Sequence, residues 1–195
     1  MKRFLLVLAL FGLAIMPAHA QKSDPEQMIR PIVHPTIQLD DHWFVASWLI
    51  GNARHQGPAG NFNAFAGLGY RFGQDWVEVM GWRQWASANH WLIDVRSSVQ
   101  FNSRTSMYNE FSPYLDQKAM YMMSTVDVSM VGRLSVGAET ENTFKSPTSS
   151  LGAGPRVSWL LANFNKTKVV STVAYQFRRD EPNVLRLYLI WHQKL

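Results

Sequence analysis

The chain has 195 residues, a formal charge of +5, eight tryptophans and no cysteine. The lack of cysteine excludes disulfide scaffolds, thiol catalysis and cysteine-based zinc sites. Basic residues are scattered among acidic ones, which argues against nucleic-acid binding, and no later segment reaches the roughly 18 uninterrupted apolar residues of a transmembrane helix.

The first twenty residues have the form of a secretory signal peptide. Lys2 and Arg3 precede an apolar run, and Ala18-His19-Ala20 has the small-x-small form of a cleavage site. Because the run is too short to cross a bilayer, we expect cleavage near Gln21 rather than a retained anchor helix. About 175 residues would remain, which is enough for one domain.

Residues 21–41 are predicted to form an extended periplasmic lead-in. Pro25, Pro31 and Pro35 are spaced so that a central strand or a helix is not expected to run through them. The predicted barrel domain therefore spans residues 42–195.

From residue 42 onward, apolar and polar side chains alternate with the period of two of a β-strand. The segment 42–51 is apolar on both faces, so its orientation is not defined, and 106–114 is counted although it contains Pro113. The ten predicted strands are 42–51, 62–73, 76–86, 90–101, 106–114, 118–131, 134–144, 150–162, 168–179 and 185–195.

The last strand shows the alternation most clearly. One face carries Leu185, Leu187, Leu189, Trp191 and Leu195, and the other carries Arg186, Tyr188, His192 and Lys194. Such a strand suits lipid on one side and a polar lumen on the other. The pattern predicts an all-β, antiparallel up-and-down transmembrane β-barrel. We expect ten strands, with eight as the alternative, because an even number returns both termini to the periplasm.

Aromatic residues near the predicted strand ends would suit the girdles at the two membrane interfaces. They are Trp43, Trp85, Trp91, Phe101, Phe177 and Trp191.

The signal peptide, the alternating strands and a terminal strand rich in leucine and aromatic residues resemble the small bacterial outer-membrane β-barrel class. The resemblance covers most of the mature chain, but the chain ends on Leu195 rather than on phenylalanine. It implies a porin-like cell-envelope protein in the outer membrane of a Gram-negative bacterium. The partners it implies are outer-membrane lipids and the barrel-assembly machinery. The His-x-Ser arrangement of barrel lipid A deacylases is absent from the sequence.

The inward faces are predicted to hold a lumen charge network. Its members are Arg71, Glu78, Asp94, Arg96, Asp127, Glu139, Glu141, Arg156, Arg178 and Arg186. Buried charges persist when they are paired, so we expect a structural salt-bridge network that fills a narrow barrel. The alternative is a narrow passage for a small charged solute. Arg178 and Arg186 flank the short turn 180–183, so they require an acid from another strand.

Catalysis is not the favoured interpretation, and no cofactor or metal site is predicted. Glu139 and Glu141 have the spacing of a carboxylate pair, but any polar strand face has it, and Arg156 is placed to neutralise them. The histidines lack HxxxH and HExxH spacing.

Three functions are therefore considered. The first is a non-enzymatic outer-membrane barrel with a structural or narrow-channel role. The second is a lipid- or lipopolysaccharide-modifying barrel enzyme with catalytic groups near His42 or His90, where a serine such as Ser87 could be activated. The third is a soluble, lipocalin-like periplasmic barrel that binds a small apolar ligand. The sequence leaves the oligomeric state and any transported molecule open.

Overall fold

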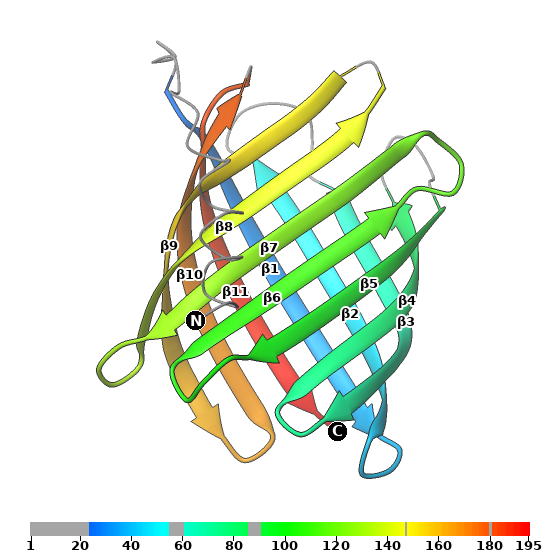
Figure 1. The fold of residues 1–195 in the computed structure, drawn as a ribbon, viewed down its shortest axis with the longest axis vertical. Coiled ribbons are helices and arrows are strands. Elements are labelled where there is room, and N and C mark those ends of the chain that lie inside the picture. The colour runs from blue at the N-terminus through cyan, green and yellow to red at the C-terminus, as the bar shows by residue number, and fades with distance from the viewer. Residues whose placement is uncertain (1–23, 55–60, 86–90, 147, 180) are drawn as a thin grey trace.

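The computed structural model describes residues 24–54, 61–85, 91–146, 148–179 and 181–195. Within these residues, eleven strands form one closed barrel (Figure 1). The strands are β1 (Glu26–Gln38), β2 (Trp43–Arg54), β3 (Asn61–Phe72), β4 (Asp75–Trp85), β5 (Trp91–Gln100), β6 (Thr105–Pro113), β7 (Ala119–Ser129), β8 (Leu134–Lys145), β9 (Thr148–Phe164), β10 (Thr167–Arg179) and β11 (Val184–Lys194). No helix in this part of the chain is long and apolar enough to span a membrane.

The all-β barrel prediction is confirmed, but the expected number of ten strands is wrong. The extra strand is β1, which lies inside the segment 21–41 that was assigned to a periplasmic lead-in. The barrel therefore begins at Glu26 rather than at residue 42. Strands that follow one another in sequence pair antiparallel, and β1 closes the barrel by pairing parallel with β11. With an odd number of strands, β1 starts at the upper end in Figure 1 and β11 ends at the lower end.

The prolines of β1 are accommodated because their missing N–H groups fall on one side of the strand. In a strand flanked by two others, alternate residues direct their N–H groups to opposite neighbours. The register of β1 with β2 has no pairs at Pro31 or Pro35, whereas the register with β11 runs without a break from Glu26 to Thr36. β1 is thus held by a complete ladder to β11 and an interrupted ladder to β2.

The doubly apolar strand β2 has a defined orientation in the barrel. Phe44, Ala46, Trp48 and Ile50 are buried on the inner face, whereas Trp43 and Leu49 are exposed on the outer face. The Phe44 ring occupies the space above Gly69 on β3, where an added Cβ would lie 2.2 Å from a ring carbon. Glycine at this position lets the ring fill the lower part of the interior.

The turn between β1 and β2 is closed by Asp40. Its carboxylate accepts hydrogen bonds from the backbone N–H groups of Trp43 (2.7 Å) and His42 (2.8 Å). These bonds, the Trp43 bond first, lower the pKa of the Asp40 carboxyl because they stabilise its ionised form. The chain can therefore reverse direction within four residues.

Candidate functional site

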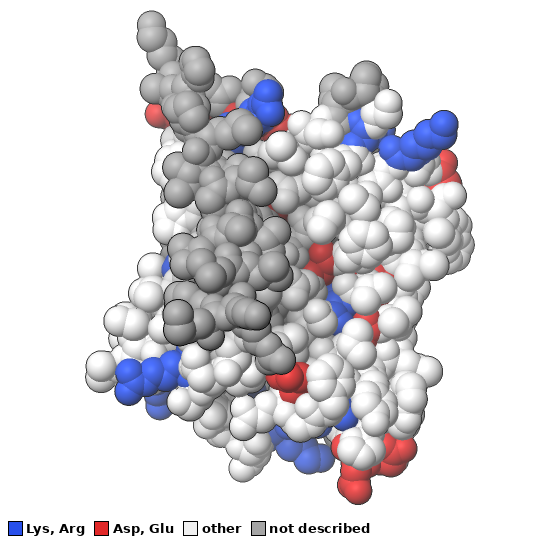
Figure 2. Space-filling view, in the orientation of Figure 1, with Lys and Arg blue, Asp and Glu red and all other residues white. Residues whose placement is uncertain are grey.

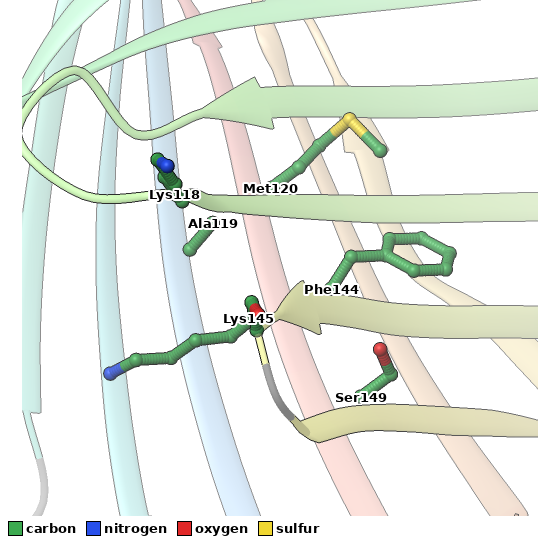
Figure 3. Close-up of a pocket in the computed structure, with 7 residues that line it drawn as sticks. Lys118, Ala119, Met120, Phe144, Lys145 and Ser149 are labelled. Carbon is green, nitrogen blue, oxygen red and sulfur yellow. The ribbon is translucent and has the colours of Figure 1, made fainter.

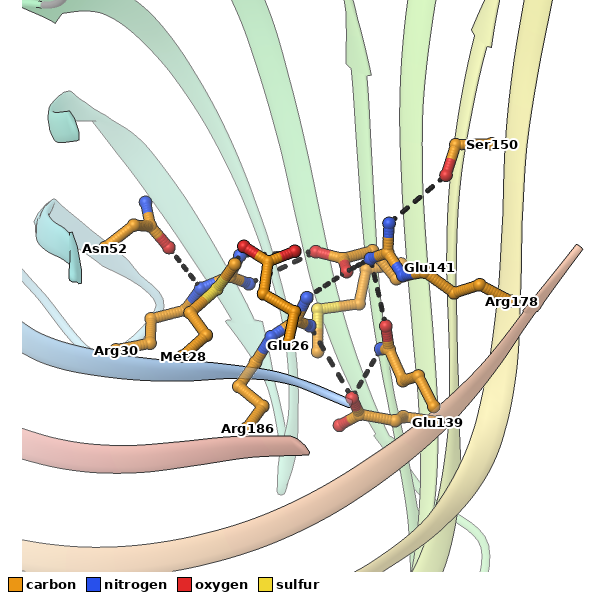
Figure 4. A network of polar contacts seen from close by, with 12 residues as sticks. Glu26, Met28, Arg30, Asn52, Glu139, Glu141, Ser150, Arg178 and Arg186 are labelled. Carbon is orange, nitrogen blue, oxygen red and sulfur yellow. Dashed lines mark hydrogen bonds and ion pairs between the residues drawn. The ribbon is translucent and has the colours of Figure 1, made fainter. Parts of the chain in front are cut away.

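The upper half of the interior is organised around the carboxylate of Glu141, on β8 (Figure 4). Its Oε1 atom lies 3.3 Å from Arg30 Nη1 and accepts a 2.7 Å hydrogen bond from the Tyr121 hydroxyl. Its Oε2 atom accepts a 2.7 Å bond from Arg178 Nη2 and a further bond from Arg186 Nη2. One carboxylate thus connects β8 to β1, β7, β10 and β11.

Glu141 is also the acid that lies against Arg178 and Arg186, the two arginines on either side of the β10–β11 turn. Both contacts are made by the same oxygen atom, Oε2. A carboxylate on a strand distant in sequence therefore balances two like charges that the hairpin brings together.

Glu139, two residues earlier on the same face of β8, forms a second centre. It accepts hydrogen bonds from Gln176 Nε2 (2.6 Å) and the Tyr188 hydroxyl (3.1 Å). Its oxygens lie 3.5 Å from Arg156 Nη1 and 3.7 Å from Arg186 Nη1. Arg156 also reaches Asp127, with 3.2 Å between Nε and Oδ1. The pairing of Glu139 and Glu141 with arginines leaves neither in the setting of an acid–base pair open to a substrate.

The lower half of the interior holds a cluster that joins β1, β2, β4 and β11. Glu78 accepts a 2.7 Å hydrogen bond from Trp48 Nε1 and lies 3.1 Å from His34 Nε2. The other ring nitrogen of His34, Nδ1, lies 3.0 Å from Nδ1 of His192, its register partner across the parallel β1–β11 pair. His34 also stacks on the Trp48 ring, with 3.9 Å between centroids. The parallel seam is therefore closed from inside by hydrogen bonds and by ring packing.

Arg96, on β5, links this cluster to the opposite wall. Its guanidinium donates to Asp94 (2.7 Å) on the same strand and to Glu110 (3.1 Å) on β6. Its Cζ atom lies 4.3 Å from the ring centroid of Trp48 and 4.3 Å from that of Phe65. A cation between two aromatic rings is stabilised by the ring quadrupoles as well as by the carboxylates.

The paired charges nearly balance over the described interior. The arginines are Arg30, Arg96, Arg156, Arg178 and Arg186, and the carboxylates are Glu78, Asp94, Glu110, Asp127, Glu139 and Glu141. Five of these eleven residues have almost no contact with solvent: Asp94 and Glu139 are 0% exposed, and Glu78, Arg96 and Arg186 are 1% exposed. Charged groups that are this deeply buried require partners. The interior combines these ion pairs with a packed apolar core that includes Trp48, Phe65, Met80 and Leu92.

Eight of the ten residues predicted for the lumen network pair with oppositely charged side chains inside the barrel. Glu78 lies there too, against Trp48 and His34, and Arg71 lies apart from them. Arg71 is at the lower end of β3, where it donates to Gln38 Oε1 (3.1 Å) and stands 5.1 Å above the Phe44 ring. Its side chain therefore lies at the lower end of the barrel, beside Gln38 at the end of β1.

Sequence reasoning missed three members of the interior: Arg30, His34 and Glu110. His192 was placed on the polar face of the last strand but not in the charge network. Arg30 and His34 lie in the proline-containing segment, and Glu110 lies in the strand assigned with least support. The signal was present in β1, where Met28, Arg30, Ile32 and His34 point inward while Ile29, Val33 and Ile37 are exposed. The prolines outweighed this alternation in the prediction.

The histidine-based enzyme hypothesis gains little from the structure. His42 is exposed in the β1–β2 turn, where Nδ1 lies 3.1 Å from the Arg71 carbonyl and the ring stacks on Tyr70. His90 and Ser87 lie outside the described residues. In the part of the chain that is described, no three histidine, aspartate or glutamate side chains are grouped so that they could hold a metal ion.

No protein-family model, curated protein or solved structure matches this chain.

Proposed function

We propose that the chain is an exported, integral outer-membrane β-barrel with a structural role in the cell envelope and an interior closed by its own side chains. The observation that carries the proposal is the outer surface. Each of the eleven described strands places at least one large apolar side chain outward with a third or more of its surface exposed. Soluble domains rarely expose apolar surface in contiguous stretches of this kind.

The exposed residues surround the barrel rather than forming one patch. From β1 to β11 they include Ile29, Val33, Trp43, Leu49, Leu68, Val79, Ile93, Phe111, Val128, Val136, Val157, Val173, Leu187 and Leu189. Long basic side chains extend from the upper and lower margins of the face seen in Figure 2. A few acidic and basic atoms are also visible near the middle of this face (Figure 2). A mainly apolar wall with charged margins suits a bilayer.

Aromatic side chains lie near both ends of the wall. Trp43, Phe101 and Trp191 are exposed toward the lower end, and Trp91 and Phe177 toward the upper end. Amphipathic rings favour the headgroup level on either side of a bilayer. The side chain of Trp85, also predicted for a girdle, lies outside the described set.

One polar row crosses the outer wall from β5 to β8 and ends at Thr140, and hydrogen bonds join its first three members. Ser97, Asn109 and Ser124 are neighbours in register on β5, β6 and β7. Ser124 donates to the Asn109 carbonyl oxygen (3.0 Å), and Asn109 Nδ2 lies 3.4 Å from Ser97 Oγ. These hydrogen bonds lower the cost of placing the three side chains against lipid.

The packed interior favours a structural role over the two alternatives that need space. A passage would need polar side chains that border water, whereas Arg96, Glu78 and Arg186 are 1% exposed. A lipocalin-like carrier would need an apolar cavity for its ligand, whereas this interior is occupied by paired charges and by packed apolar side chains.

Fractionation tests the proposal. The full chain, including residues 1–20, is expressed in a diderm bacterium, and the membranes are washed with alkaline carbonate. We expect the protein to stay in the outer-membrane pellet until detergent is added, with a mature N-terminus at Gln21. Release by carbonate alone would overturn the membrane proposal, and an intact N-terminus would overturn the signal peptide.

A further inference from the structure

A groove on the outer wall at the upper end of β7 and β8 combines cationic and apolar groups (Figure 3). It has a volume of about 420 Å³ and is lined by Lys118, Ala119, Met120, Phe144, Lys145, Ser146 and Ser149. The lining contains two lysines and no acidic residue. The nearest acidic residue in the preceding turn, Asp116, is not part of the lining.

The register of the strands orders these groups from the wall toward the rim. Met120, Phe144 and Ser149 are partners in one row across β7, β8 and β9. Ala119 and Lys145 form the next row, at the strand ends, and Lys118 precedes β7. Figure 3 shows the Lys145 side chain extending beyond the end of β8. Apolar side chains thus face the level of the acyl chains, and ammonium groups lie at the rim.

We infer that this groove binds the phosphate headgroup of an anionic lipid, with the adjacent acyl chain against Met120 and Phe144. The inference rests on the proposed membrane location. The ammonium groups of Lys118 and Lys145 attract the negative charge of a phosphodiester. The exposed Ser146 and Ser149 supply hydroxyl donors beside them. Phe144 is 36% exposed on the apolar wall. A lipid needs contact along one side only, since the bilayer covers the rest, so an open groove is sufficient.

Native mass spectrometry of the full protein in detergent tests the inference. The probes are a phosphatidylglycerol and a phosphatidylcholine with the same acyl chains, and inorganic phosphate. We expect phosphatidylglycerol to be retained preferentially. A lysine near a charged surface contributes about 1 kcal/mol, or about fivefold, so Lys118→Gln/Lys145→Gln should lower this preference by roughly tenfold to thirtyfold.

The matched control is Lys166→Gln/Lys194→Gln, which removes the same charge at the lower end and should keep the preference. Phe144→Ser should weaken retention of both lipids, because it removes the acyl contact and leaves the lysines in place. Displacement of phosphatidylglycerol by millimolar inorganic phosphate would indicate a free-anion site and overturn the lipid assignment. If Lys118→Gln/Lys145→Gln retains the same preference for phosphatidylglycerol over phosphatidylcholine, the groove is not the headgroup site.

Vesicle flotation separates this inference from the proposed function. If the protein fails to insert into phosphatidylcholine vesicles, the membrane proposal is wrong, and the inference that the groove binds a lipid is wrong as well. If it inserts and retains both lipids equally, only the headgroup inference is wrong.

Discussion

Glu141 joins β8 to four other strands, because its two carboxylate oxygens contact Arg30, Tyr121, Arg178 and Arg186. Replacing it by glutamine would keep the shape and remove the charge. Three arginines would then lose their shared counter-ion in an interior that excludes water. Breaking a buried ion pair in this way costs about 3–5 kcal/mol. We expect Glu141→Gln to lower the unfolding midpoint in urea, followed by tryptophan fluorescence of the barrel in lipid vesicles.

Glu181 supplies the control for that measurement. It also pairs with Arg178, at 3.0 Å, but its side chain is 44% exposed at the rim. Exposed pairs contribute about 0–1 kcal/mol, so Glu181→Gln should leave the midpoint nearly unchanged. Equal losses in the two variants would contradict the central position of Glu141.

The hydrogen bonds to Asp40 predict how the stability of the β1–β2 turn depends on pH. Because hydrogen bonds from Trp43 and His42 hold its folded-state pKa below the ordinary value of 3.8, it favours the folded turn above that value. This contribution is lost as the pH falls through the lower, folded-state pKa. Carboxyl-carbon NMR should show Asp40 titrating below an unstructured aspartate, and a normal midpoint would exclude the turn geometry.

At the level of the element, β1 shows where reasoning from sequence succeeded and where it failed. Alternation located the strands after residue 42 because the outer and inner environments differ along the whole barrel. It failed at β1, because a rule against prolines in central strands assumes that a missing N–H breaks a needed bond. Pro31 and Pro35 are four residues apart and face the same neighbour, so the ladder to β11 survives. The parallel pairing itself leaves no sequence pattern.

The candidate site, like the fold, was predictable from the sequence only in part: its residues could be found, but their partners could not. Residues such as Arg96, Glu139 and Arg186 stand out as charges on the inner face of apolar strands. Their partners could not be assigned, because Glu141 meets Arg30 from 111 positions away, across the closed barrel. Such contacts depend on shear and strand number, and one additional strand changes which walls face each other.

The β1–β11 register can be tested by cross-linking, since the chain has no native cysteine. Ile29 and Leu187 are register partners with exposed side chains on the outer face. We expect Ile29→Cys/Leu187→Cys to cross-link with a short thiol reagent in the folded barrel and to lose the link on unfolding. The control, Ile29→Cys/Tyr188→Cys, puts the thiols on opposite faces and should not react. A cross-link in the control alone would place β1 one residue out of register.

For the whole molecule, the decisive property is an apolar outside around a charged inside. A soluble domain buries its apolar surface and keeps its ions in water. This barrel reverses that arrangement in part: it buries its ions beside an apolar core that includes Ile32, Phe65 and Met80, and it exposes large apolar side chains on its outer face. The reversal places the five interior arginines where only protein carboxylates can balance them. Stability and closure of the lumen therefore have the same origin, because the side chains that pair also fill the space between the walls.

Because the paired side chains also close the lumen, we expect the protein not to conduct ions across a bilayer. Reconstituted in a planar bilayer, the wild-type barrel should show no stepwise ohmic conductance, while a water-filled porin in the same bilayer serves as the positive control. Arg96, Glu78 and Glu139 are at most 1% exposed, so they leave no room for a water column at their level. Steady open-channel current from correctly folded protein would show that the interior rearranges, and a narrow-channel role would then replace the structural one. Insertion must be established independently by vesicle flotation. The absence of current then shows that the barrel is closed, rather than that the bilayer contains no protein.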